Sequence, residues 1–286
     1  MSSKQKKYTV AIIGAGRISA SFDAPKSKNI LTHAHAIQKN PRLALLGFVD
    51  QDAVRGTREA KRWRAKCFPS IEALYKIEKP DIVVVATPDH THVRILARLS
   101  KLKPKLIICE KPVVAHMGDI AIMQKLRLPP TIVNYSRRFD PTVAKLAADI
   151  ANGKWGSIIA VRGIYTGSLL HNGSHLVDLA RCLVGDKIKL ELTQGDVRAY
   201  SVFEIDILMS RGRVRFVNGG RQLLIERPKP DPMYRGFKTL GTARSIQTNI
   251  QDALPNLYRH ALAVLDGTTR PHPSIAEALA TEKKVL

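Results

Sequence analysis

Glu110 and Lys111 are the residues whose types and position are best suited to chemistry. They follow the apolar run Leu106–Ile108 and Cys109, and Pro112 comes directly after them. A doubly wound α/β sheet binds its ligand outside the carboxyl ends of its strands, so two opposite charges there predict a functional site. A lysine ammonium in a closed cleft stabilises a developing alkoxide. The alternative is that Lys111 only forms an ion pair with Glu110, as buried charges also do without catalysis.

His175 is the second candidate for catalysis. Ser174 is a predicted N-cap, apolar residues follow it at helical spacing, and Gly185 is the predicted end of the helix. His175 would then lie in the first turn, where the positive end of the helix dipole disfavours the charged imidazole and leaves a neutral ring that can accept a proton. The alternative for His175 alone is a core histidine near a helix cap.

The N-terminal segment has the features of a dinucleotide-binding turn. Tyr8–Ile13 is predicted to be a buried strand, and a glycine turn follows it at once. The first glycine makes the turn, and the second lets the backbone approach a pyrophosphate, whose charge is received by the next N–H groups. The predicted cofactor contacts in this turn are Gly14, Gly16, Arg17 and Ile18. Ser19 replaces the third glycine of the fingerprint, and the polar stretch 22–31 predicts that a loop interrupts the following helix.

An acidic residue ends the second predicted strand. Asp50 follows Leu43–Val49, where a carboxylate accepts hydrogen bonds from the adenosine ribose hydroxyls and repels a 2′-phosphate. The sequence therefore favours NAD as the cofactor. Arg55 and Arg58 keep NADP as an alternative. The other interpretation of these two arginines is that they are solvated charges on a helix.

A third predicted strand brings further groups to the cofactor. The β-branched run Asp81–Ala86 is typical of a parallel strand that is covered on both faces. It stops at Thr87 and Pro88, which are expected with His92 at the same edge of the sheet. His90 and His92 resemble a metal-binding pair, but no carboxylate or cysteine with ligand spacing accompanies them, so no metal site is predicted.

Taken in order, these motifs resemble those of the GFO/IDH/MocA family of nicotinamide-dependent oxidoreductases, which is named for glucose-fructose oxidoreductase and inositol dehydrogenase. The resemblance continues with Asn134–Asp140 and covers nearly the whole chain. It implies an α/β Rossmann domain with a doubly wound parallel sheet, residues 1–135, followed by an α+β domain with a largely antiparallel open sheet, residues 136–286. The active site is expected between these domains.

The resemblance also assigns roles to single residues. It implies that Lys111 lies beside the nicotinamide and the reacting hydroxyl, that Glu110 contacts the nicotinamide ribose, and that His175 is the catalytic acid/base. Family members commonly carry aspartate four residues before this histidine, where the present chain has His171. His171 either makes a polar contact to substrate, or belongs to a subgroup that acts on a different sugar, or marks lost activity. The remaining predicted substrate contacts are Arg138 and Asn172.

The second half of the chain is predicted to form an open sheet with closing helices. Apolar and polar residues alternate along Val197–Met209, which indicates a strand with one buried face, and the turn Asn218–Gly220 predicts a hairpin. Ala253–Leu265 and Ser274–Leu286 are the predicted closing helices. The segment 228–249 is expected either to close over an anionic substrate or to be a disordered surface loop. The exposed sheet face predicts a homo-oligomer.

The composition is that of an ordinary globular protein that favours anionic partners. The chain has 286 residues, with 46 Lys+Arg against 24 Asp+Glu and a net charge of +22. The excess lies in short clusters at Lys4–Lys7, Arg55–Lys66 and Arg211–Arg215, and 6% of residues are aromatic, so no specific nucleic-acid site is predicted. Three scattered cysteines indicate a reducing compartment. No apolar run approaches the roughly 20 residues of a membrane span, and the predicted location is the cytoplasm.

The predicted function is reversible hydride transfer between NAD(P) and a secondary alcohol or ketone of a sugar, a cyclitol or a nucleotide sugar. His175 would take the hydroxyl proton, and Lys111 would stabilise the alkoxide. The positive charge favours a phosphorylated or nucleotide-linked substrate. The alternative is a catalytically altered NAD(P)-binding sensor or regulatory protein on the same fold, because fold does not fix function.

Overall fold

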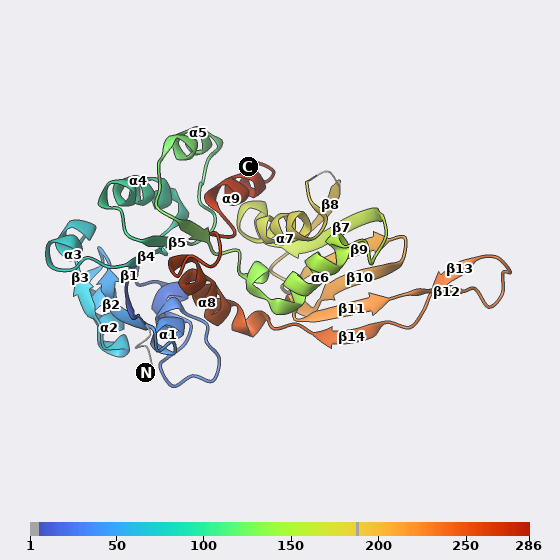
Figure 1. The fold of residues 1–286 in the computed structure, drawn as a ribbon, viewed down its shortest axis with the longest axis horizontal. Helices are drawn as coiled ribbons and strands as arrows, with labels where there is room; N and C mark the ends of the chain where they lie inside the picture. Colours follow the sequence, from blue (N-terminus) through green and yellow to red (C-terminus); the bar gives the residue numbers. More distant parts are fainter. Residues whose placement is uncertain (1–5, 187–188) are drawn as a thin grey trace. The chain divides into compact units, whose positions relative to one another are not determined.

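The computed structural model describes residues 6–186 and 189–286, which form two compact units. The first unit comprises the described residues up to Tyr135 together with Gln251–Lys284 and Leu286. The second comprises the described residues of Ser136–Ile250 with Val285. Figure 1 shows the course of the chain. Of the predicted basic clusters, the one at the N-terminus lies partly outside the described residues, because Lys4 is not among them.

The first unit is built on a six-stranded parallel sheet, which confirms the predicted Rossmann arrangement. Its strands are β1 (Tyr8–Ile13), β2 (Leu43–Val49), β3 (Lys66–Phe68), β4 (Ile82–Val85), β5 (Leu106–Cys109) and β6 (Thr131–Val133). Their order is β3-β2-β1-β4-β5-β6, so the direction of winding reverses between β1 and β4 (Figure 1). Every residue of β4 and β5 is buried, which explains their continuous apolar sequences. Ligands of such sheets bind where the winding reverses.

Short helices connect these strands. They are η1 (Arg17–Ser21, a π-helical turn), α1 (His33–Gln38), α2 (Ala53–Trp63), α3 (Ile71–Ile77), η2 (Asp89–Thr91), α4 (His92–Leu102) and α5 (Met117–Lys125). The predicted interruption after the glycine turn is confirmed, since eleven residues lie between the end of η1 and the start of α1. The Asp23 carboxylate fixes the intervening loop by accepting hydrogen bonds from the Leu31 N–H and the Thr32 hydroxyl, both at 2.6 Å. No helix in the described part of the chain is long and apolar enough to cross a membrane.

The last two helices pack in the first unit. They are α8 (Ala253–Leu265), which follows the short turn η6 (Ile250–Asp252), and α9 (Ile275–Glu282). Ala278 and Leu279 of α9 join the buried cluster that contains Val133 and Tyr135. This differs from the predicted division into 1–135 and 136–286, which placed both helices in the second domain. The apolar stripe of a helix shows that one face is buried, but not which sheet covers that face.

The second unit has a six-stranded open sheet that is largely antiparallel, as predicted. Its strands are β7 (Ile158–Thr166), β8 (Leu190–Gly195), β9 (Phe203–Met209), β10 (Gly212–Val217), β11 (Gln222–Glu226) and β14 (Arg244–Gln247). The order is β14-β11-β10-β9-β7-β8, and only the β7–β8 pair is parallel. Two helices, α6 (Pro141–Ala151) and α7 (Ser174–Val184), pack on the sheet through a buried apolar cluster. The short turns η3 (Ser136–Phe139) and η4 (Leu169–Gly173) precede these helices.

The predicted alternation in this unit is confirmed over β9, where burial alternates residue by residue. The strand begins at Phe203, however, and Val197, where the prediction began, is 50% exposed in a turn. Apolar and polar residues alternate before the start of the strand as well, so the alternation does not predict where the strand pairing begins. The predicted hairpin turn is confirmed, since η5 (Asn218–Gly220) joins β10 to β11.

Residues 228–249 contain ordered strands and are not the disordered loop that was one expectation. A two-stranded hairpin pairs β12 (Pro228–Pro230) with β13 (Lys238–Leu240), and β14 then returns to the main sheet. Figure 1 shows the hairpin extending beyond the edge of that sheet. Its turn exposes three apolar side chains, those of Met233, Tyr234 and Phe237. The expectation that this segment closes over a substrate stays a prediction.

Candidate dinucleotide and catalytic site

The glycine turn after β1 is shaped for close approach of a ligand. Gly14 has φ +94°, and a Cβ placed there would lie 2.6 Å from the carbonyl oxygen of Ala86, so only glycine fits. At Gly16 a Cβ would meet no atom within 4 Å, which leaves open space over the backbone. Ser19, in the place of the third glycine, is fully buried. The turn therefore fits a pyrophosphate, although only the single π-helical turn η1 follows it.

Asp50 is held beside this turn as an ionised group. It is 5% exposed, and one carboxylate oxygen accepts the Ala15 N–H at 2.8 Å, while the other accepts the Asp52 N–H at 2.9 Å. Arg55 donates to both oxygens, at 2.9 and 2.7 Å. Burial alone would raise the pKa of Asp50, but the hydrogen bonds from Arg55 and the two amides hold that pKa below its ordinary value. Arg55 is thus an ion-pair partner of Asp50 and not a solvated helix charge.

A cavity of about 390 Å³ joins these groups in the first unit. Of the predicted cofactor residues, it brings together Gly14, Gly16, Asp50, Thr87 and Pro88. The sequence interpretation missed other lining residues, among them Pro69, Ser70 and Ile71 before and in α3, and Arg94 and Arg98 on α4. The helix cap at Ser70 was the one signal that could have found the first group, because a residue that caps a helix after a strand lies at the ligand-binding edge.

His92 ties the ends of two neighbouring strands together. Its ring is 1% exposed, with Nδ1 at 2.7 Å from the Pro112 carbonyl oxygen and Nε2 at 2.9 Å from that of Thr87. Thr87 follows β4, and Pro112 follows β5 and Lys111. The structure therefore gives His92 a role in positioning the backbone around these predicted site residues. Its predicted direct contact to the cofactor stays a prediction.

Glu110 lies at the end of a buried series of hydrogen-bonded side chains. Its Oε1 atom lies 2.8 Å from Nε2 of His33 and accepts the Asn134 side-chain amide at 2.6 Å. His33 is fully buried, and its Nδ1 lies 2.9 Å from the hydroxyl of Tyr258, on α8. Burial by itself would raise the pKa of Glu110, but His33, Asn134 and the charge of Lys111 hold it below its ordinary value. Glu110 is therefore an oriented carboxylate at the end of β5.

Lys111 follows Glu110 and is joined to Pro112 by a cis peptide bond. Its charge lowers the pKa values of two carboxyl groups in the same unit, Glu110 and Glu282. Glu282 is fully buried on α9 and accepts the backbone N–H groups of Val113 and Val114 at 2.7 and 3.1 Å. Burial nevertheless raises the pKa of Glu282 to about 7. The sequence interpretation missed Glu282, which lies far from Lys111 along the chain and in no motif.

In the second unit, His175 lies in the first turn of α7 and is partly buried. The predicted N-cap is wrong: Ser174 is the first helical residue, no side chain caps the helix, and η4 runs directly into it. The side chain that does cap this segment is Ser168, whose hydroxyl accepts the His171 N–H at 3.1 Å. Asn172 donates its side-chain amide to the Thr166 carbonyl at 2.6 Å, so part of its hydrogen-bonding capacity holds the loop.

Arg138 forms a buried, two-pronged ion pair with Asp178. Its guanidinium donates to the two carboxylate oxygens at 2.8 and 2.7 Å, and the two side chains are 4% and 2% exposed. The pair joins η3 to α7, which carries His175. The neighbouring Arg137 stacks on Phe203 at 3.4 Å, and burial lowers its pKa to about 10. The predicted substrate contact of Arg138 stays a prediction, and the structure adds a positioning role for it.

Comparison with known proteins agrees with the Rossmann arrangement of the first unit. Residues 8–127 match the GFO_IDH_MocA family model, described as an oxidoreductase family with an NAD-binding Rossmann fold. An inositol 2-dehydrogenase of Corynebacterium glutamicum (strain R) is 27% identical over 201 residues, which cover 64% of this chain and 56% of that protein. A levoglucosan dehydrogenase of Pseudarthrobacter phenanthrenivorans is 32% identical over 140 residues, which cover 38% of this chain and 35% of that protein. The chain thus spans about half the length, or less, of these two relatives.

Solved structures share the fold at low sequence identity. An oxidoreductase from Agrobacterium radiobacter, in complex with NAD⁺, L-tartaric acid and magnesium, has a TM-score of 0.75 at 18% identity and covers 98% of this chain and 94% of its own. The WlbA dehydrogenase from Chromobacterium violaceum, in complex with NADH and UDP-GlcNAcA, has a TM-score of 0.74 at 18% identity. The match covers 98% of this chain and 92% of the WlbA chain. The predicted resemblance to the GFO/IDH/MocA oxidoreductases is confirmed over residues 8–127, which match the family model for the NAD-binding Rossmann fold.

Proposed function

We propose that this chain is an NAD-dependent oxidoreductase that moves a hydride reversibly between the nicotinamide and a secondary alcohol or ketone of a sugar, a cyclitol or a nucleotide sugar. The observation that carries the proposal is the oriented carboxylate of Glu110, with Lys111 next in the chain, at the end of β5 and in the same unit as the glycine turn and the ionised Asp50. The names of the relatives support the substrate class, since they include inositol and levoglucosan dehydrogenases.

The residues of the first unit fit NAD. The glycine turn leaves space for a pyrophosphate, and Asp50 presents an ionised carboxylate where ribose hydroxyls are expected. Glu110 is assigned to the nicotinamide ribose, as the resemblance implies, and the hydrogen bonds that fix its Oε1 atom to His33 and Asn134 support a defined direction for this carboxylate. The cofactor, when bound, supplies the hydride acceptor or donor, and the protein supplies orientation and electrostatics.

Lys111 and His175 are the proposed catalytic residues. Lys111 stabilises the negative charge that develops on the substrate oxygen, and electrostatic stabilisation of this kind is usually the largest single contribution to catalysis. His175 accepts the hydroxyl proton during oxidation and returns it during reduction. The Arg138–Asp178 ion pair holds the start of α7, so it positions His175 without taking part in proton transfer.

His171 and Asn172 are the proposed substrate contacts that precede His175. Both residues are exposed in η4. A histidine in the place of the common aspartate makes this part of the site less acidic, which favours an anionic substrate such as a phosphorylated or nucleotide-linked sugar. The net charge of +22 acts in the same direction by attracting anions to the whole surface.

We further propose a cytoplasmic homo-oligomer. The outer face of the second-unit sheet bears exposed apolar side chains of β7, including Ile159 at 65% and Ile164 at 44% exposure, and an apolar face of this kind favours self-association. None of the three cysteines forms a disulfide, as suits a reducing compartment. Light scattering of the purified chain, compared with an Ile164→Lys variant, tests the oligomer: the variant is expected to dissociate, and a monomeric unmodified chain would contradict the proposal.

The experiment that tests the proposed activity is a screen for nicotinamide reduction. Cyclitols, free sugars, sugar phosphates and nucleotide sugars are offered separately with NAD and with NADP, and the absorbance of the reduced cofactor is followed. The proposal expects turnover with at least one polyol-like substrate and a preference for NAD. Protein that binds NAD tightly but leaves it oxidised with every substrate would instead support a sensor.

A further inference from the structure

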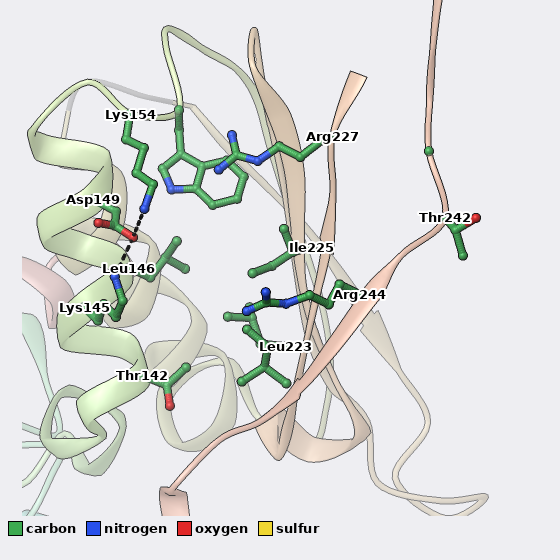
Figure 2. Close-up of a pocket in the computed structure, with 13 residues that line it drawn as sticks. Thr142, Lys145, Leu146, Asp149, Lys154, Leu223, Ile225, Arg227, Thr242 and Arg244 are labelled. Atoms are coloured by element: carbon green, nitrogen blue, oxygen red, sulfur yellow. Dashed lines mark hydrogen bonds and ion pairs between the residues drawn. The ribbon is translucent and has the colours of Figure 1, made fainter. Parts of the chain in front are cut away.

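We propose that the second unit carries a binding site for a small organic anion with an apolar body, in a cavity that is separate from the catalytic and cofactor residues. The cavity has a volume of about 410 Å³ and lies between α6 and the strands β11 and β14 (Figure 2). This volume is in the range of small-molecule sites, roughly 300–1,000 Å³. None of the predicted or proposed site residues lines it.

The floor of the cavity is apolar. Its lining includes Leu146 of α6, Trp155 after that helix, Leu223 and Ile225 of β11, and Ile246 of β14. Figure 2 shows the side chains of Leu146, Leu223 and Ile225 converging between the helix and the sheet. Such a floor would bury the hydrocarbon or aromatic body of a ligand, and burial of apolar area is the main source of affinity in sites of this kind.

The rim of the cavity is cationic. It holds four basic side chains, Lys145, Lys154, Arg227 and Arg244, against the single carboxylate of Asp149. Lys145 and Lys154 both donate to the same oxygen of Asp149, at 3.1 and 3.2 Å (Figure 2). Arg227 stacks on the Trp155 ring at 3.7 Å and donates to a backbone carbonyl. The rim therefore carries a net positive charge of three, which favours an anionic head group.

Two hydrogen-bond donors at the cavity have no partner among the described residues. Trp155 is 2% exposed, and its Nε1 atom is buried without a hydrogen-bond acceptor. A buried N–H without an acceptor is unfavourable, and Trp155 is one of the residues that line the cavity. No described residue accepts a hydrogen bond from the Arg244 side chain, which reaches from β14 toward Leu223 and Ile225 (Figure 2). A carboxylate or phosphate head could be held by Arg244 with its body on the apolar floor.

The combination selects against the other ligand classes. An uncharged apolar molecule would fill the floor but leave the cationic rim without an acceptor, and an organic cation would be repelled by it. A highly polar anion would leave the apolar side chains of the floor in contact with water. The site is therefore assigned to amphipathic anions, and the shared chemistry is an apolar body that ends in a carboxylate or a phosphate.

The test uses the two tryptophans of the chain, Trp63 and Trp155. Trp63 lies in the first unit, where its ring is buried. A Trp63→Phe variant leaves Trp155 as the single fluorophore, next to the proposed site. We expect saturable changes in its fluorescence on titration with octanoate or octyl phosphate, and much weaker ones with octanol or octylamine. The tighter of the first two ligands shows whether the natural head group is a carboxylate or a phosphate.

Substitutions of Arg244 then locate the site. Arg244→Gln is expected to weaken octanoate binding roughly tenfold, because one charge-assisted hydrogen bond is lost. Arg244→Lys should retain most of the affinity. The matched control is Arg198→Gln, which removes the same charge from an exposed position outside the cavity, and it should leave binding unchanged. Isothermal titration calorimetry on the chain with both tryptophans gives the same comparison if the Trp63→Phe variant folds poorly.

Three outcomes would overturn the proposal. The first is the absence of saturable binding of either anion by the unmodified chain in calorimetry. The second is octanol binding as tightly as octanoate, which would show that the cationic rim has no part in recognition. The third is equal weakening by Arg244→Gln and Arg198→Gln, which would show a general effect of surface charge. The measurement needs no turnover, so its result is independent of the proposed oxidoreductase activity.

Discussion

The imidazole of His33 lies 2.8 Å from the carboxylate of Glu110 and 2.9 Å from the hydroxyl of Tyr258. Because Glu110 is held ionised, the ring donates from Nε2 to Glu110, and its Nδ1 atom shares a second hydrogen bond with the Tyr258 hydroxyl. This arrangement fixes the direction of the Glu110 carboxylate at the end of β5. Three segments that are distant in sequence, namely α1, β5 and α8, therefore combine to orient one predicted cofactor contact.

Neutralising Glu110 tests this assignment. Glu110→Gln keeps an oxygen for His33 and Asn134 but removes the charge, so the fold should persist while the hydrogen bonds to ribose hydroxyls weaken. We expect the KM for NAD to rise about tenfold, in line with the loss of one charged hydrogen bond of about 1.5 kcal/mol. Steady-state kinetics with varied NAD measures this. Glu191→Gln, at an exposed position of the second unit, is the control, and an unchanged KM in the Glu110 variant would remove Glu110 from the cofactor site.

The Asp50–Arg55 pair sets the expected cofactor preference. Asp50→Ser removes the carboxylate that repels a 2′-phosphate and releases Arg55 to bind one. The ratio of kcat/KM for NADP to that for NAD should therefore rise at least about tenfold, equivalent to about 1.4 kcal/mol. Adding Arg55→Ser to this variant should abolish most of the gain. If the double variant favoured NADP as strongly as the single one, Arg55 would have no part in discrimination.

Breaking the Arg138–Asp178 pair should destabilise the second unit. Asp178→Asn leaves the Arg138 guanidinium buried with a neutral partner, and breaking such a buried pair typically costs about 3–5 kcal/mol. Urea unfolding followed by circular dichroism should show a clearly lower midpoint. The exposed pair Arg198–Asp196 offers the matched control, since Asp196→Asn should leave the midpoint unchanged. Equal midpoints for the two variants would mean that the buried pair is not stabilising.

Glu282 should make the stability depend on pH. Burial raises its folded-state pKa to about 7, against 4.5 for an ordinary glutamate. Between these values the unfolded chain releases a proton that the folded chain retains, so stability falls as the pH rises toward 7 and then levels off. The loss attributable to this group is about 3 kcal/mol.

The comparison of Glu282 with a neutral residue isolates that contribution. Unfolding of the unmodified chain and of Glu282→Gln is measured at about pH 5 and about pH 8, on either side of the raised pKa. The unmodified chain should lose stability relative to the variant as the pH rises. A stability difference that stays constant, or that shifts in favour of the unmodified chain at the higher pH, would show that Glu282 is ionised throughout.

The parts of the site that the sequence could predict are local. Each of Gly14, Asp50, Thr87 and Glu110 follows directly after an apolar run, and parallel strands bring their carboxyl ends to one edge. The strands, the order of motifs and the interrupted first helix could be read for the same reason. Lys111 and His175 could also be found locally, from the end of a strand and the start of a helix, whereas His171 was singled out by the resemblance of the motifs. The roles of all three remain proposals.

The parts that the sequence could not predict depend on contacts between distant segments. His33 and Tyr258 are separated by 225 positions, and Glu282 lies 169 positions from Val113, so no spacing pattern connects them. The return of α8 and α9 to the first unit is hidden for the same reason. The N-cap assigned to Ser174 failed because the preceding residues continue into the helix as η4, which a capping pattern does not reveal.

The turnover of a Lys111→Met variant is the most direct test of the proposed chemistry. Methionine keeps most of the length and the apolar character of the side-chain stem but removes the charge, so NAD binding should be retained within about threefold while kcat falls about 100- to 1,000-fold. The control is Lys105→Met, which changes an exposed lysine just before the same strand, β5, and should turn over normally. With a substrate identified in the screen, this loss confined to Lys111 is the predicted result. A Lys111→Met enzyme that kept the kcat of the control would contradict the mechanism.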